Sequence, residues 1–308
     1  MKKTRTLIFV VLCLVFFMPA KGQQAPFYTQ YMFNDYLVNP AVAGTNNYFQ
    51  IRANSRIQWI GMSDAPRTMS IAAYGPFKEK TMGYGGYIYN DVTGPESRLS
   101  LGGTYSYNLM ITDMMRISGG ITVGLMQYKL DGTKINIGDQ VGGYDPAFPD
   151  GVESKIIPDA SAGIYLYSTY YYVGISAHQL LGNKFNLHDD LDSVDTDMGI
   201  NRLKQHLYLS GGYHFILNRD FVLQPSAMIK YTGPGQIQAE LNVTTTYQRM
   251  IWGGLTYRTG DAIAVLLGYN YESKIYFGLS YDITVSELRR YSNGTIEVMI
   301  GYRFNDIK

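Results

Sequence analysis

Four histidines, His178, His188, His206 and His214, are the side chains best suited to metal binding or acid–base chemistry. His206 and His214 share one predicted strand, where the rise per residue separates them by about 27 Å, too far to share a metal. His178 and His188 lie on either side of the start of a predicted loop and lack the spacing of metal ligands. We interpret all four as structural imidazoles and predict no metal site.

Nucleophilic and cofactor chemistry has little support. Ser176 and His178 are two residues apart on one strand face, but a GxSxG nucleophile elbow is absent. Gly83, Gly85 and Gly86 belong to a predicted strand rather than to a phosphate-binding loop. Basic residues are dispersed and the formal net charge is +1, so no nucleic-acid surface is indicated. We therefore predict a non-enzymatic protein without a cofactor.

Carboxylates crowd two predicted loops and could bind calcium through hard oxygen ligands. One set is Asp189, Asp190, Asp192, Asp195 and Asp197, and the other is Asp139, Asp145, Asp150 and Glu153. The first set lacks the glycine and the terminal glutamate of an EF-hand loop. We interpret both as solvated outer loops, with calcium binding left open.

The elements that would position these residues are strands with two different faces. Residues 236–248 show this best, because apolar side chains alternate with polar ones over a length that spans a bilayer. One face carries Ile237, Ala239, Leu241, Val243, Thr245 and Tyr247, and the other carries Gln236, Gln238, Glu240, Asn242, Thr244, Thr246 and Gln248. Such alternation is typical of a transmembrane β-barrel, whose average hydropathy is low because the two faces cancel.

The pattern predicts an all-β fold, a transmembrane antiparallel barrel of about 14 strands. We expect them at 48–60, 66–76, 82–91, 97–110, 114–129, 157–168, 170–181, 202–217, 220–231, 236–248, 250–258, 262–272, 274–284 and 295–304. Tight connections follow the even strands and the long ones follow odd strands, as in outer-membrane barrels with short periplasmic turns. A soluble sandwich would need a second layer over the apolar faces, and no helix is available to supply it.

The chain begins with the three parts of a secretory signal: basic residues, an apolar run and the small-x-small end at Ala20–Gly22. We predict a signal peptide at 1–22 and a mature start at Gln23. The single cysteine, Cys13, lies inside it, so the mature chain has no thiol. We further predict an N-terminal segment at 23–47, in the lumen or at the periplasmic mouth, and a barrel over 48–308.

Residues 26–44, PFYTQYMFNDYLVNPAVAG, do not fit the strand pattern, yet they are too apolar to stay in water. Together with RIQWIG at 56–61, Pro66, Arg67 and Thr68, YDITVSEL at 281–288 and Gly294, they resemble the PorP/SprF family of Bacteroidetes outer-membrane proteins. The resemblance covers essentially the whole mature chain.

The resemblance implies a non-enzymatic outer-membrane component of type IX secretion and gliding. It would assist export or surface anchoring of a secreted adhesin-like protein. The implied partners are outer-membrane lipid, that surface protein or its C-terminal domain, and a periplasmic secretion-machinery or peptidoglycan-linked protein. The alternative is a passive channel or small-solute transporter, which would require an open lumen or a polar substrate pocket.

Two groups of candidate site residues follow. Partner-binding or plug candidates are Gln30, Tyr31, Phe33, Asn34, Tyr36, Asn39, Pro40 and Gly44. Lumen-facing candidates are Arg52, Arg56, Gln58, Arg98, Glu240, Asp282, Glu297 and Arg303, to which Arg116 and Lys230 belong by the same alternation. Buried charges need partners, so we expect ion pairs across the lumen or contacts to the N-terminal segment.

Overall fold

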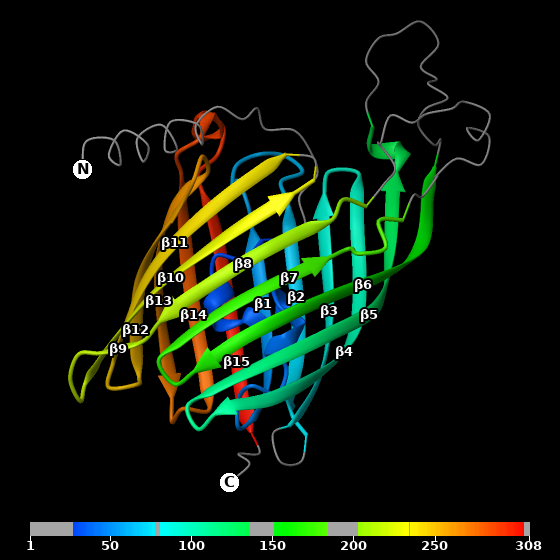
Figure 1. Ribbon diagram of the computed structural model, residues 1–308. Coiled ribbons are helices and arrows are strands. Elements are labelled where there is room, and N and C mark those ends of the chain that lie inside the picture. The colour runs from blue at the N-terminus through cyan, green and yellow to red at the C-terminus, as the bar shows by residue number, and fades with distance from the viewer. Residues whose placement is uncertain (1–26, 78–80, 136–150, 184–202, 234, 305–308) are drawn as a thin grey trace, which may run out of the picture.

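The protein is a β-barrel with its N-terminal segment inside (Figure 1). The structure, a computed structural model, describes residues 27–77, 81–135, 151–183, 203–233 and 235–304. The strands are β1 (Phe49–Ile57), β2 (Arg67–Pro76), β3 (Met82–Thr93), β4 (Glu96–Thr112), β5 (Met115–Asp131), β6 (Val152–Ser168), β7 (Tyr171–His178), β8 (His206–Tyr213), β9 (Phe215–Ile216), β10 (Phe221–Thr232), β11 (Gln236–Tyr247), β12 (Ile251–Arg258), β13 (Ala262–Tyr271), β14 (Ile275–Thr284) and β15 (Thr295–Phe304). Short 3₁₀ helices are η1 (Tyr31–Phe33), η2 (Asp35–Leu37), η3 (Pro40–Val42), η5 (Gly132–Lys134) and η7 (Glu287–Arg290).

The sheet closes on itself because its first and last strands pair. β15 lies antiparallel to β1, with Phe49 opposite Phe304 and Ile57 opposite Ile296. β8 and β9 both pair with β10 and are separated only by His214, so they form one interrupted strand. Counted in this way, the wall is the 14-stranded antiparallel barrel that the sequence predicts.

Each strand separates an apolar outer face from a mostly polar inner face. In β14 exposed and buried residues alternate along the whole strand. In β11 Leu241 is 59% exposed, whereas its neighbours Glu240 and Asn242 are almost fully buried. Because water would not stabilise such an outer surface, this is the face that a bilayer covers. Among the described residues, no helix is long and apolar enough to cross a membrane.

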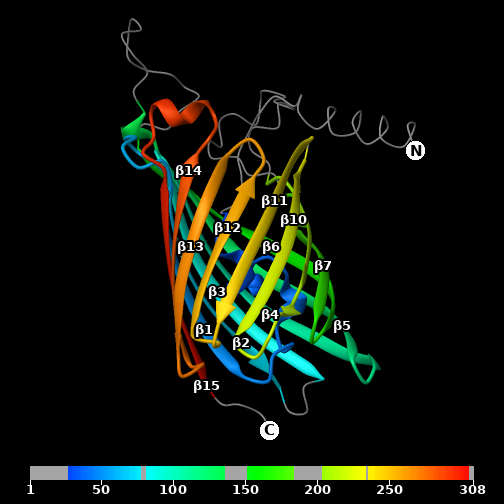
Figure 2. The same cartoon turned by 90° about the vertical axis from the view of Figure 1, so that its left-hand side faces the viewer.

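The two rims of the barrel differ in their connections (Figure 2). Tight turns join β4 to β5, β6 to β7, β11 to β12 and β13 to β14, and β15 ends at this same rim. Two of these turns place consecutive residues at positive φ, Gln248 with Arg249 and Glu272 with Ser273, which matches the twist of a two-residue hairpin. The opposite rim carries the longer connections after β1, β5, β7 and β14. Outer-membrane barrels have their short turns on the periplasmic side, so the short-turn rim is the one that faces the periplasm.

Several expectations lie outside the described residues. They are the signal peptide at 1–22, His188, the aspartates at 189–197, and Asp139, Asp145 and Asp150. Glu153 is described, and it belongs to β6 rather than to a loop. β6 begins at Val152, five residues before the expected start at residue 157, because Val152–Ile157 continue the ladder with β5.

The outward position of Leu241 near the middle of β11 gives a test of the lipid face. Leu241→Arg should destabilise the barrel by roughly 2–4 kcal/mol, because arginine is costly at the bilayer midplane. Ile237→Arg, on the same face but near the rim, should cost only about 0–1 kcal/mol. Denaturant unfolding in lipid bilayers, followed by the heat-modifiable gel shift, measures both variants. Equal effects would show that this face does not contact the hydrocarbon layer.

Candidate functional site: the segment inside the barrel

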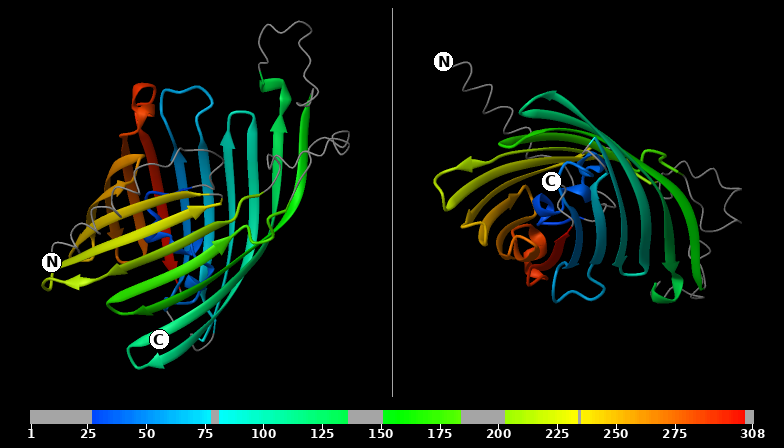
Figure 3. Two further views of the ribbon diagram at one scale, coloured as in Figure 1. Left: turned by 45° about the horizontal axis from the view of Figure 1, so that its top comes forward. Right: turned by 90° about the horizontal axis from the view of Figure 1, so that it is seen from below.

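Residues 27–47, named here the lumen segment, lie inside the barrel. Seen from the short-turn side, this segment occupies the interior of the ring of strands (Figure 3). Tyr31, Tyr36 and Ala41 are each at most 3% exposed, although the short helices that hold them have few internal hydrogen bonds. Because so short a helix is not stable alone, contacts with the barrel wall determine its conformation.

The segment is attached to the wall at Thr29, on the long-loop side of the lumen. The Thr29 hydroxyl donates to Asp282 Oδ2 at 2.8 Å and accepts from Arg56 Nη1 at 2.6 Å and from Arg258 Nη2 at 3.0 Å. The Thr29 amide donates to Glu297 Oε2 at 2.7 Å. One residue of the segment thereby contacts four charged side chains from β1, β12, β14 and β15.

These side chains, with Glu240, form a buried ionic network that we call the charge anchor. Arg56 pairs with Asp282 at 2.9 Å and with Glu297 at 3.1 Å. Arg258 pairs with Glu240 at 2.8 Å and with Asp282 at 3.2 Å. All five side chains are at most 2% exposed, so each charge depends on its partners. Removing one partner from such a buried pair typically costs about 3–5 kcal/mol.

Apolar and aromatic contacts hold the next part of the segment. Tyr31 and Met32 pack in a cluster with Trp252, Leu266 and Met299 of the inner wall. Two ring contacts flank this cluster: Phe33 lies 4.1 Å from Trp252 and Tyr36 lies 4.4 Å from Tyr74, measured between ring centroids. The Tyr36 hydroxyl also hydrogen-bonds Thr104 at 2.6 Å. These rings hold the segment against two different parts of the wall, β12 and β2, which β13, β14, β15 and β1 separate.

The last part of the segment runs close to the wall as it descends to β1. Asn39 donates to the Ile164 carbonyl at 3.0 Å and caps η3 by accepting from the Ala41 amide at 2.9 Å. Ser118 donates to the Ala41 carbonyl at 2.6 Å. A Cβ at Gly120 would lie 2.5 Å from the Ala41 nitrogen, so only glycine permits this approach. Gly44, at positive φ, meets the backbone of Gly83 near the short-turn rim.

The partner-binding or plug candidates all lie in this segment. Gln30, Tyr31, Asn34, Tyr36, Asn39 and Pro40 are buried, Gly44 is buried at the short-turn end, and Phe33 is half-buried. The structure places only the end of the segment at the short-turn mouth, whereas Thr29 and Gln30 lie among the last residues of β1, β12 and β14, on the long-loop side.

The lumen-facing candidates occupy three different settings. Arg56, Glu240, Asp282 and Glu297 meet in the charge anchor, together with the unexpected Arg258. Arg52 and Arg303 lie on either side of Tyr276 at the short-turn end. Arg98 forms an ion pair with Glu96 at 3.0 Å. Gln58 directly follows β1 at the rim, where its backbone amide donates to the Pro66 carbonyl at 2.9 Å. The ion pairs join nearby strands of the wall rather than crossing the lumen.

Ser176 and His178 do not form a catalytic pair. The Ser176 hydroxyl donates to the Val38 carbonyl at 2.6 Å, and His178 Nε2 bonds the same oxygen at 2.6 Å. His178 is the register partner of His206, a juxtaposition that the spacing along one strand did not reveal. Among the described residues, no group of three or more histidine, cysteine, aspartate or glutamate side chains could hold a metal ion.

Arg258 of the charge anchor and Thr29, which binds to the anchor, were not predicted from the sequence. Arg258 ends a predicted strand on whose inner face Trp252 and Thr256 also lie, so the alternation alone could have found it. Thr29 carries no signal, because a lone threonine before an apolar stretch is common.

The sequence and the fold of this chain are similar to those of known proteins. The sequence model of the type IX secretion system membrane protein PorP/SprF matches residues 20–302. The chain belongs to the PorP/SprF family. This places it in the bacterial outer membrane as a multi-pass barrel associated with type IX secretion, rather than in an enzyme family.

Solved structures of similar fold are outer-membrane transporters and channels. The Ralstonia pickettii toluene transporter TbuX aligns with a TM-score of 0.51 at 9% identity, covering 88% of this chain and 92% of that one. The monoaromatic hydrocarbon channel CymD gives 0.52 at 12% identity, covering 94% and 96%. The Pseudomonas putida toluene transporter TodX gives 0.52 at 10% identity, covering 93% and 96%. At these identities the likeness concerns the fold alone. A search of the curated proteins finds no match.

The charge anchor predicts how the lumen segment can be released. Thr29→Val removes the hydroxyl that serves Arg56, Arg258 and Asp282, and each lost hydrogen bond to a charged group is worth about 1.5–3 kcal/mol. The one cysteine of the sequence, Cys13, lies in the predicted signal peptide, so after the expected cleavage Val42→Cys gives a single buried reporter thiol. We expect its maleimide labelling to accelerate in the Thr29→Val background.

The matched control is Thr68→Val. Thr68 is a buried threonine that also bonds a carboxylate, Asp91 at 2.6 Å, but it belongs to β2. Labelling that accelerates equally in both backgrounds would mean that Thr29 has no special part in holding the segment.

Proposed function

We propose that this PorP/SprF protein is a non-enzymatic barrel that assists export or surface anchoring of a secreted adhesin-like protein. The observation that carries the proposal is that the sequence motifs shared with the family come together inside the barrel. QYMFN, RIQWIG and YDITVSEL are far apart in the sequence, yet Gln30, Arg56 and Asp282 all lie at or beside the charge anchor. A barrel needs no such internal arrangement to close, which supports a role for the filled lumen.

The partners that we propose lie on both sides of the membrane. A secreted surface protein, or its C-terminal domain, would be held on the long-loop side, where the charge anchor connects the segment to the ends of β1 and β14. A periplasmic secretion-machinery or peptidoglycan-linked protein would meet the short-turn rim. The lumen segment touches wall strands near both rims, so it offers a physical link between the two sites.

The second candidate, a passive channel for small solutes, has less support. Buried side chains of the lumen segment occupy the section of the lumen between Trp252 and Tyr74. The fold is shared with transporters and channels, but a solute path here would require the segment to move. Conductance in planar bilayers distinguishes the two candidates, since a passive channel conducts without any change to the segment.

The functional test replaces Tyr31, Phe33 and Tyr36 together by serine. We expect the barrel to reach the outer membrane while surface display of its cognate secreted protein falls by about tenfold or more, because the segment loses its main apolar contacts. The cognate protein is first identified by affinity purification from the native outer membrane with mass spectrometry. Display is then measured by surface labelling, with barrel abundance as the reference.

A milder variant keeps the test decisive if the triple variant does not assemble. Phe33→Ala removes the half-buried ring that contacts Trp252 and keeps the buried tyrosines in place. Met69→Ala, on the lipid face of β2, is the matched truncation outside the lumen. Unchanged display in an assembled triple variant, or in Phe33→Ala if the triple variant does not assemble, would overturn the proposal.

A further inference from the structure

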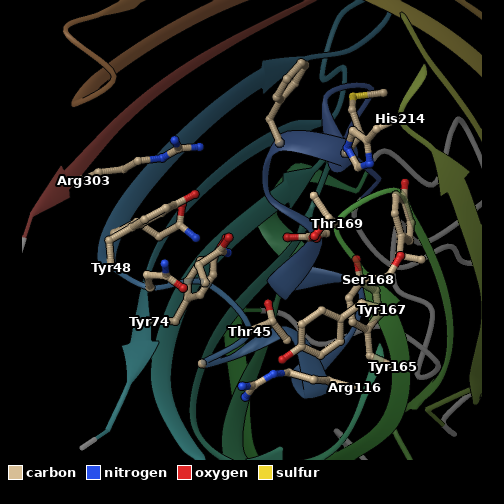
Figure 4. A pocket seen from close by; sticks show the side chains of 18 of the residues that line it. Thr45, Tyr48, Tyr74, Arg116, Tyr165, Tyr167, Ser168, Thr169, His214 and Arg303 are labelled. Atoms are coloured by element: carbon tan, nitrogen blue, oxygen red, sulfur yellow. The ribbon is translucent and has the colours of Figure 1, made fainter. Parts of the chain in front are cut away.

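The short-turn half of the lumen contains a cavity of about 610 Å³ (Figure 4). Residues 44–47, at the end of the lumen segment, and the following Tyr48 form part of its lining. The turns at Asp113 and Thr169 also line it, so the cavity lies at the periplasmic rim, away from the charge anchor. Its volume is within the range of ligand-binding pockets.

Three guanidinium groups line this mouth cavity, from Arg52 in β1, Arg116 in β5 and Arg303 in β15. Arg303 lies over the rings of Tyr48 and Tyr276, at 4.4 and 3.8 Å from their centroids. Among the described residues, no carboxylate oxygen lies within ion-pair distance, 4.0 Å, of these three arginines. This differs from the charge anchor, where each arginine contacts at least two carboxylates.

The cavity wall also contains polar atoms that have no hydrogen-bond partner among the described residues. They are Arg303 Nε, Tyr74 Oη, His214 Nδ1 and Asn270 Oδ1, and all four are buried. Tyr74 and Asn270 are at most 8% exposed as whole side chains. Among the described residues, four of the eighteen buried polar atoms without a hydrogen-bond partner thus belong to side chains that line this cavity, although each of these atoms is itself covered by protein.

The charge balance of the lining favours an anion. Asp35 and Asp113 also line the cavity, so three positive side chains face two negative ones. Arginine recognises a carboxylate through two parallel N–H donors, which gives both strength and direction. Arg303 and Arg116 project from different parts of the wall, as Figure 4 shows, so the carboxylates they bind would be separated along an extended ligand.

We propose that the mouth cavity binds an acidic peptide segment that enters from the periplasmic side. A peptide fits better than an acidic saccharide, because sugars stack on free aromatic faces and several rings here stack on one another. Tyr165 lies 5.6 Å from both Tyr167 and Tyr172, measured between ring centroids. The lining also contains hydroxyl, amide and guanidinium groups, from side chains such as Ser168, Gln224 and Arg116, which can pair with the C=O and N–H groups of a peptide backbone. The inference rests on the proposed function only for which protein supplies the peptide.

Binding is measured on the full mature barrel, purified from the outer membrane and placed in lipid nanodiscs. The probe is a fluorescein-labelled heptapeptide that alternates acidic residues with tyrosine and glycine, and its anisotropy reports binding. The matched probe carries asparagine and glutamine in place of the acids. We expect the acidic peptide to bind about tenfold or more tightly than the amide peptide, and to weaken with added salt.

Arg116→Gln and Arg303→Gln should each weaken binding of the acidic peptide by about tenfold, because each removes a charge-assisted contact. Arg303→Lys keeps the charge but loses the planar pair of donors, so binding should fall between the parent and Arg303→Gln. Arg67→Gln is the control, since Arg67 is exposed at the opposite rim and should not affect binding. Heat-modifiable gel migration confirms that each variant is folded.

Three results would overturn the inference: equal binding of the acidic and amide peptides, unchanged binding in both folded glutamine variants, or preferential binding of an acidic trisaccharide. A different set of results would show that the proposed function is wrong while the peptide-binding inference holds. In that case the parent binds the acidic peptide, the arginine variants do not, and surface display of the secreted protein is the same in all of them.

Discussion

The interior of this barrel is organised around the hydrogen bonds of the Thr29 hydroxyl. This hydroxyl lies between two guanidinium groups and a carboxylate. Arginine and carboxylate side chains buried this deeply lose their hydration, and their mutual attraction offsets that loss only when the remaining donors and acceptors are used. Thr29 supplies such a partner at the centre of the network. The lumen segment and the wall thus share one hydrogen-bonded network.

Much of the barrel could be predicted because the signal for a strand is local. Alternating side chains in residues 236–248 reveal both the strand and its two faces, and β11 runs over Gln236–Tyr247. The prediction was less accurate for β6, which begins at Val152. Pro158 within it has no amide to donate, and Glu153 and Lys155 look like loop residues. Pairing with β5 outweighs these local preferences, and one-strand patterns do not contain that information.

The interior was predicted only in part, because its contacts join residues far apart in the sequence. Alternation placed Arg56, Asp282 and Glu297 on the inner face, but not beside one another, since their distances depend on how the barrel closes. Thr29 and Asp282 are 253 positions apart. The mouth cavity had even less sequence signal. Its arginines look like any lumen-facing charge until closure brings β15 beside β1 and leaves Arg303 without an ion-pair partner among the described residues.

Closure by β15 has a consequence for the order of assembly. This strand follows all the other described strands in the chain, yet its Glu297 accepts hydrogen bonds from the backbone amides of both Thr29 and Gln30, which precede the first strand. The final strand and the first folded residues are thus completed together, when β15 pairs with β1. A chain that stopped short of Thr295 would leave Arg56 without one of its two carboxylates and Thr29 without its backbone acceptor. The network is therefore complete only in a chain that includes β15.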